Sequence, residues 1–107
     1  MVVSLEEIQR VCDEIVEKFH PEKIILFGSY ASGTQNEHSD VDILIVMEHE
    51  RSPMASAINI LRAVKPRFGT DLIVHSPQEF AERLSMGDYF LRSVQKTGKV
   101  LYESAYH

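Results

Sequence analysis

The chain has 107 residues, 44% of them hydrophobic and 25% charged, which predicts one globular domain over residues 1–107 with a single core. Its formal net charge of −5 and the lack of a basic stripe argue against general nucleic-acid binding, which depends on Lys and Arg neutralising phosphates. No apolar run approaches the ~20 residues that a membrane-spanning helix needs, and the start of the chain lacks the pattern of a signal peptide, so we expect a cytoplasmic protein without membrane contact.

The first predicted element is an amphipathic helix. Ser4 to Glu7 has the form of a capping box, in which Ser4 accepts from an early helical N–H and Glu7 reaches back. Apolar residues recur at helical spacing as far as Phe19, and Pro21 marks the end of the helix. Cys12 occupies an apolar position in this pattern, so it is expected to be a buried core thiol rather than a nucleophile.

Two apolar strands then enclose a polar segment. Residues 24–27 form a continuous apolar run, as in an interior strand that is covered on both faces. Gly28 ends this strand, and the small polar residues that follow allow a short helix over Tyr30–Ser32. Residues 41–46 predict a second buried strand, which is interrupted only by Asp42.

The rest of the chain alternates helices and strands. The expected elements are a helix from Ser52-Pro53 toward Pro66, a strand over residues 72–74, two helices that begin after Ser76 and Asp88, and an edge strand over residues 100–102. This order predicts an α/β (α+β) fold with a mixed or mostly parallel sheet of about four strands, packed by helices. Ligands of such sheets bind at the carboxyl ends of strands, here near the loop over residues 28–39.

Asp40 and Asp42 lie at the entrance of the second apolar strand. Residues i and i+2 of a strand point to the same face, with Cα atoms ~6.5–7 Å apart. Two carboxylates on one face of an apolar strand repel each other and lose hydration unless a cation lies between them. Mg²⁺ suits such a pair, because it takes carboxylates together with substrate phosphates and waters. For the pair alone, two solvated acids at a frayed strand end are the competing interpretation.

Gly28 and Ser29 follow the first apolar strand. A glycine at this point lets a ligand approach the backbone closely, because no Cβ is in the way. The next amides and the Ser29 hydroxyl can then donate to phosphate oxygens. The segment is not a Walker loop, since no Gly-Lys-Ser/Thr follows. Taken alone, Gly28-Ser29 is equally consistent with an ordinary strand-ending turn.

The two motifs together are more specific. Gly-Ser, then ten residues, then Asp-x-Asp between two apolar strands resembles the signature of the nucleotidyltransferase superfamily that includes DNA polymerase β. The form GSYASG…SDVDILIV is similar to the minimal nucleotidyltransferase (MNT) family, and the similarity extends to the closing GKVLYE. The resemblance implies a polymerase β-like nucleotidyltransferase fold.

The resemblance also implies a role for each residue of the motifs. Gly28 and Ser29 would bind the triphosphate of ATP, and Asp40 and Asp42 would bind divalent metal. The family's third carboxylate falls on Asp71, which a parallel neighbouring strand could bring to the pair, although Asp71 is also acceptable as a simple turn residue. Three carboxylates can hold two Mg²⁺ ions, which stabilise the entering and leaving groups of an in-line displacement. Asp71 would ligate a metal or accept the proton of the acceptor hydroxyl.

Some residues depart from the family or stay outside its motifs. Ser32 stands where the family often has Arg or Lys, which removes a phosphate partner and bears on nucleotide affinity and rate. Tyr30 could stack on a base or simply fill the groove. The histidines lack ligand spacing and are expected to be non-functional; these are His38, His49 and His75, of which His75 is the best candidate.

For function, the resemblance implies an antitoxin. MNT proteins transfer AMP from ATP to a tyrosine of a HEPN ribonuclease toxin, so a HEPN-domain toxin is the expected partner. Two alternatives stay open, namely a non-catalytic module that neutralises its partner by binding and a catalytic subunit that modifies a small molecule. An exposed apolar patch at Tyr89 and Phe90 would indicate assembly, including a homo-oligomer.

Overall fold

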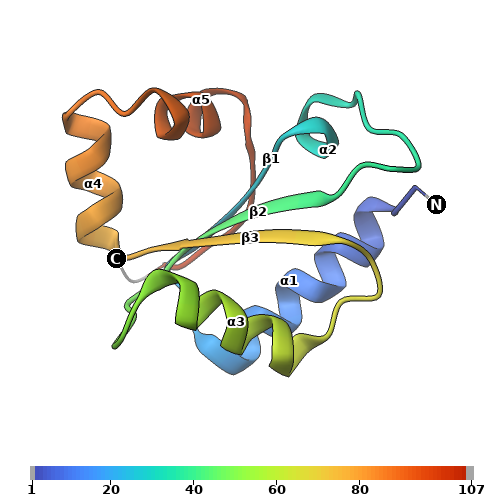
Figure 1. Cartoon of the computed structure of the whole chain (residues 1–107), viewed down its shortest axis with the longest axis horizontal. Helices are drawn as coiled ribbons and strands as arrows, with labels where there is room; N and C mark the ends of the chain where they lie inside the picture. The colour runs from blue at the N-terminus through green and yellow to red at the C-terminus, as the bar shows by residue number, and fades with distance from the viewer. Residues whose placement is uncertain (1, 106–107) are drawn as a thin grey trace.

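A four-stranded sheet with the strand order β3-β2-β1-β4 organises the chain (Figure 1). The computed structural model describes residues 2–105. Strand β1 (Lys23–Phe27) is antiparallel to both of its neighbours, β2 (Val41–Val46) and β4 (Lys99–Glu103). Strand β3 (Thr70–His75) runs parallel to β2. The expected mixed sheet is confirmed, whereas the idea that it could be mostly parallel is wrong.

The connections explain these directions. Between β1 and β2 the chain forms only the one-turn helix α2 (Ser29–Ser32) and a loop, without a crossover helix that spans the sheet, and β2 returns antiparallel to β1. Between β2 and β3 it forms α3 (Pro53–Val64), a crossover helix that returns the chain to the same end of the sheet.

Helices cover both faces of the sheet. In Figure 1, α1 (Leu5–Phe19) and α3 lie below the sheet, while α4 (Pro77–Ser85) and α5 (Tyr89–Thr97) lie beside and above it. Each face therefore has its own apolar core. The core under α1 and α3 includes Ile8, Ile15, Ile24, Leu26, Ile43, Ile45 and Ile60, and the core under α4 and α5 consists of Ile25, Leu44, Val46, Phe80, Leu91 and Val94.

Capping residues begin the helices where the sequence predicts. The Ser4 hydroxyl accepts from the Glu7 amide at 3.1 Å. Ser76 and Glu79 form a complete capping box, since each side chain accepts from the backbone amide of the other residue. The Asp88 carboxylate accepts from an amide in the first turn of α5. None of the helices within the described part of the chain is long and apolar enough to cross a membrane.

Two details of the core bear on function. Cys12 is fully buried, and burial raises the pKa of its thiol to about 12, which confirms a core thiol rather than a nucleophile. Tyr30 is also buried, and its hydroxyl accepts from the Val3 amide at 3.0 Å. Tyr30 therefore fills the core and is not available to stack on a base.

Candidate active site

The parallel pairing of β2 and β3 brings two carboxylates together. Strand β3 begins at Thr70, two residues earlier than the sequence predicts, so Asp71 lies inside the strand. The register sets Asp71 directly beside Asp42. Because side chains alternate along a strand, Asp42 and Asp71 share the face of Leu44 and Ile73, which is the face that α4 and α5 cover. Asp40 immediately precedes β2 and is exposed.

The electrostatics show that this pair carries uncompensated negative charge. Partial burial raises the pKa of Asp42 to about 6, and a hydrogen bond and repulsion from Asp71, followed by repulsion from Asp40, add to the rise. A cation or a proton must relieve such repulsion. The oxygen-only donor set fits Mg²⁺, which commonly uses one or two carboxylates and completes its shell with substrate phosphates and waters.

Gly28 shapes the space beside Asp42. Its φ of 73° and ψ of −153° belong to a region that residues with a Cβ rarely adopt. A Cβ at this position would overlap Oδ2 of Asp42. The first N–H groups of a helix lack acceptors within that helix, so the amides of Ser29 and Tyr30 at the start of α2 are the candidates for phosphate oxygens. The glycine therefore allows this turn, a candidate phosphate-binding turn, to lie in contact with a carboxylate.

A matched pair of glycine variants tests this packing. Gly33 also has a positive φ, of 79°, but a Cβ there would meet no atom within 4 Å. Gly33→Ala should cost only backbone strain, about 1 kcal/mol. We expect Gly28→Ala to lower the free energy of unfolding by about 1–3 kcal/mol more than Gly33→Ala. The φ and ψ of Gly28 are open almost to glycine alone, whereas Gly33 is in the αL region, and Asp42 must also move. Urea unfolding of both variants measures the difference, and equal losses would contradict contact between Gly28 and Asp42.

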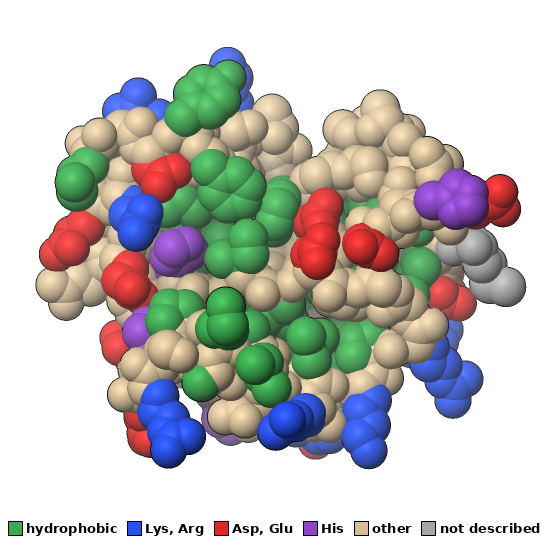
Figure 2. All heavy atoms as spheres, viewed as in Figure 1, with side chains coloured by type: hydrophobic (Ala, Val, Ile, Leu, Met, Phe, Trp, Pro, Cys, Tyr) green, Lys and Arg blue, Asp and Glu red, His purple; other side chains and the backbone are tan. Residues whose placement is uncertain are grey.

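The site lies at the carboxyl end of β1, beside the loop over residues 28–39 as expected, but at the amino ends of β2 and β3. Because β1 is antiparallel to β2 and β3, the carboxyl end of β1 meets the amino ends of β2 and β3. Gly28 follows the first end, and Asp42 and Asp71 belong to the other two. Figure 2 shows acidic side chains gathered in a notch of the surface, between the part formed by α2 and the part formed by α4 and α5. The expectation of carboxyl ends holds for β1 only.

Asp40 lies slightly apart from the pair. Its Oδ1 packs against Gly69, where a Cβ would overlap it, and the Gly69 carbonyl accepts from the Val41 amide at 2.9 Å. Within residues 2–105, no three His, Cys, Asp or Glu side chains converge closely enough to hold a metal ion as placed. A cation at this site would therefore use the Asp42–Asp71 pair first, and a shift of Asp40 would add a third ligand. The sequence offered no signal for Gly69.

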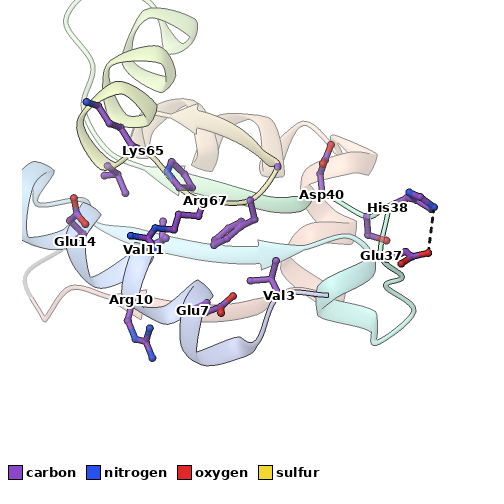
Figure 3. Close-up of a pocket in the computed structure, with 15 residues that line it drawn as sticks. Val3, Glu7, Arg10, Val11, Glu14, Glu37, His38, Asp40, Lys65 and Arg67 are labelled. Carbon is purple, nitrogen blue, oxygen red and sulfur yellow. Dashed lines mark ion pairs between the residues drawn. The ribbon is translucent and has the colours of Figure 1, made fainter. Parts of the chain in front are cut away.

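A groove of about 880 Å³ lies on the other side of Asp40. It is formed by α1, the end of α3, the loop over residues 65–69 and the loop over residues 37–40, and both charged and apolar side chains line it (Figure 3). Figure 3 shows Asp40 at one end, with its carboxylate directed away from Val3 and Arg67. Neither Asp42 nor Asp71 lines this groove. It is therefore separate from the acidic pair.

The remaining candidates do not join the site. The Ser32 hydroxyl contacts the Ser29 carbonyl at 3.3 Å and the Thr34 hydroxyl at 2.9 Å, within its own turn. His75 is the last residue of β3, at the opposite end of the strand from Asp71. His49 makes a 2.7 Å hydrogen bond with the Glu79 carboxylate. His38 is exposed beside Glu37.

Known proteins are similar to this chain in both sequence and fold. A family model described as "Nucleotidyltransferase domain" matches residues 6–101. A relative from Methanocaldococcus jannaschii, named "Putative protein adenylyltransferase MJ0604", is 38% identical over 82 residues, which are 75% of this chain and 77% of the relative.

Three solved structures show the same fold at 21–22% identity. A Sulfolobus solfataricus protein described as a "putative nucleotidyltransferase" has a TM-score of 0.66, with 95% of this chain and 82% of that chain covered. A toxin-antitoxin with AMP-PNP has a TM-score of 0.58, with 91% and 74% covered. A MntA-HpeT toxin-antitoxin mutant has a TM-score of 0.55, with 96% and 76% covered, and its name records aspartate-to-glutamate changes at two positions that are separated by one residue.

The family match spans the strands and loops that carry Gly28, Ser29, Asp40, Asp42 and Asp71. The match and the M. jannaschii relative agree with the nucleotidyltransferase resemblance of the motifs, and the solved structures share the fold. The chain belongs to the nucleotidyltransferase domain family and is a nucleotidyltransferase.

Proposed function

We propose that this protein transfers AMP from ATP to a hydroxyl group of a partner protein, and that the partner is a toxin that the transfer silences. The observation that carries the proposal is the Asp42–Asp71 pair in contact with the Gly28 turn. The name of the M. jannaschii relative supports a protein as the acceptor. The toxin-antitoxin assemblies among proteins of the same fold support a toxin as the partner. The proposed partner class is a HEPN-domain ribonuclease with a tyrosine acceptor, and the proposed location is the cytoplasm.

Each residue has a proposed task. The turn at Gly28 and Ser29 holds the triphosphate, while Asp40, Asp42 and Asp71 hold divalent cation, proposed as two Mg²⁺ ions. Bound metal would neutralise charge on the phosphates and acidify the acceptor hydroxyl. The acceptor oxygen forms a bond to the α-phosphorus, the bond to the bridging oxygen of the β-phosphate breaks, and pyrophosphate leaves. The hydroxyl proton passes to the carboxylate of Asp71, which is exposed and accessible to an acceptor.

The spacing of the acids supports these roles. The two aspartate-to-glutamate changes in the MntA-HpeT structure are separated by one residue, as Asp40 and Asp42 are. The AMP-PNP complex in the other toxin-antitoxin structure supports an adenine nucleotide as the substrate. The raised pKa of Asp42 supports a cation at the pair, because a bound cation would offset the partial burial and the repulsion from Asp71 and Asp40 that raise it.

The test is direct transfer. The chain is incubated with the protein that copurifies with it, ATP and Mg²⁺, and intact mass spectrometry follows both proteins. We expect the partner to gain the mass of AMP, on a tyrosine, and to lose its ribonuclease activity. The same mixture without ATP, or with EDTA, should show no gain. A partner that stays unmodified while it is fully inhibited would overturn the proposal.

One observation favours a second candidate, a non-catalytic antitoxin that neutralises its partner by covering it. Ser32 contributes no cation to the phosphates and bonds within its own turn. The net charge of −5 suits the basic site of an RNA-cleaving partner. A chain with both Asp40→Asn and Asp42→Asn separates the two functions in cells. Continued protection from the toxin would favour binding, and lost protection would favour transfer.

A further inference from the structure

An apolar ledge, formed by the rings of Phe27 and Phe90, adjoins the acidic pair Asp42 and Asp71. Phe27 ends β1, and the ring of Phe90 on α5 packs on it edge to face, with centroids 5.4 Å apart and an interplanar angle of 85°. Phe90 nevertheless stays 44% exposed. Its contact with Phe27 fixes the ring without covering it. Figure 2 shows hydrophobic side chains next to the acidic side chains in the notch.

The strand register places this ledge beside the phosphate turn. Phe27 is the partner of Asp42 in the β1–β2 pair, and residues directly opposite in an antiparallel pair point to the same face. Phe27 also immediately precedes Gly28. A triphosphate at Gly28 and a cation at Asp42 would therefore have the Phe27–Phe90 pair as their apolar neighbour, on the face that α5 covers.

We propose that Phe90, supported by Phe27, stacks on the base of the bound nucleotide; this rests on the function proposed above. An exposed ring that another ring already orients loses little freedom on binding, and base–aromatic stacking is sequence-tolerant because every base has a π-face. Tyr30 is unavailable for this role because it is buried. Since Ser32 supplies no cation to the phosphates, base stacking would be a large share of the nucleotide affinity.

The experiment separates the base from the phosphates. Calorimetry with Mg²⁺ measures the binding of two probes, a non-hydrolysable ATP analogue and inorganic tripolyphosphate, to the wild type and to variants. We expect Phe90→Ala to weaken the ATP analogue about 5- to 20-fold and to leave tripolyphosphate unchanged. Phe90→Tyr should restore binding to within about twofold, because it keeps the ring. Phe90→Leu keeps apolar volume without a π-face and should resemble Phe90→Ala, which guards against loss of folding in the alanine variant.

Tyr89 provides the matched control. It is the neighbouring aromatic residue on α5 and is 87% exposed, so Tyr89→Ala should leave the binding of both probes unchanged. The stacking role is overturned if Phe90→Ala changes the binding of neither probe, or weakens the binding of both equally. It is also overturned if Phe90→Ala only disrupts the complex with the partner protein, because the ring would then be a protein contact. A wild type that binds tripolyphosphate but shows no effect of Phe90 overturns this inference alone. A wild type that binds neither probe overturns the proposed function as well.

Discussion

Replacing Asp42 by Asn is expected to lower the rate of AMP transfer by on the order of 10³-fold while the protein stays folded. Asp42 is the central acid of the site, since it is in register with Asp71, in contact with the Gly28 turn and two residues from Asp40. An amide of the same shape preserves packing but carries no charge for a cation. The measurement is the initial rate of AMP incorporation into the partner protein under saturating ATP and Mg²⁺.

The control for this loss is Asp13→Asn. Asp13 is an exposed carboxylate on α1 that accepts from the Gln9 side chain at 3.0 Å, on the face of the sheet away from the pair. The same chemical change there should leave the rate within about twofold of wild type. Asp71→Asn should be nearly as damaging as Asp42→Asn, because both acids form the pair. A rate above one tenth of wild type for Asp42→Asn would contradict the assigned role.

The sequence predicts this site well because its chemistry is local. Gly28-Ser29 and Asp40-Val41-Asp42 lie in one short segment of the chain. The first motif follows an apolar run that marks a buried strand, and the second motif begins the next such run. Asp71 is distant in the chain, yet a helix between two strands predicts parallel neighbours. The structure places Asp71 beside Asp42 through that pairing. Strand β3 is longer than the predicted strand over residues 72–74 because its ends also pair with β2. The apolar pattern of the sequence does not reveal this pairing.

Other features depend on tertiary contacts that no local pattern specifies. The direction of β1 relative to β2 depends on how the chain crosses the sheet, so it was not evident that the amino ends of β2 and β3 would meet the carboxyl end of β1. Gly69 lies against Asp40 only because β3 and the start of β2 are adjacent. The ring contact between Phe27 and Phe90 joins residues that are 63 positions apart in the chain. The exposure of Phe90 and Tyr89, expected from the sequence only as a condition for assembly, is a property of the folded surface.

Asp42→Asn should also stabilise the protein, and this effect should depend on pH. The pKa of Asp42 is about 6 in the folded chain against an ordinary value of 3.8, so the folded state binds more protons than the unfolded state between these pH values. The contribution of Asp42 to stability is thus fully present below pH ~4 and is lost as the pH rises through ~6. This difference between the two pKa values corresponds to at most about 3 kcal/mol in the free energy of unfolding. Because Asp42 is partly exposed to solvent, we expect an effect of about 1–2 kcal/mol.

Thermal unfolding of wild type and Asp42→Asn at several pH values measures this pH-dependent difference in stability. At pH 8 the variant should melt about 5–10 °C higher, since 1 kcal/mol shifts the Tm of a 100-residue domain by about 4–8 °C. At pH 4 the two curves should coincide, because Asp42 is then protonated and resembles Asn. Mg²⁺ with ATP should narrow the gap at pH 8 by stabilising only the wild type. A variant that melts lower than wild type at pH 8 would show that favourable contacts stabilise the ionised Asp42 carboxylate. The argument that a cation is needed to offset its unfavourable burial and repulsion would then lose its physical basis.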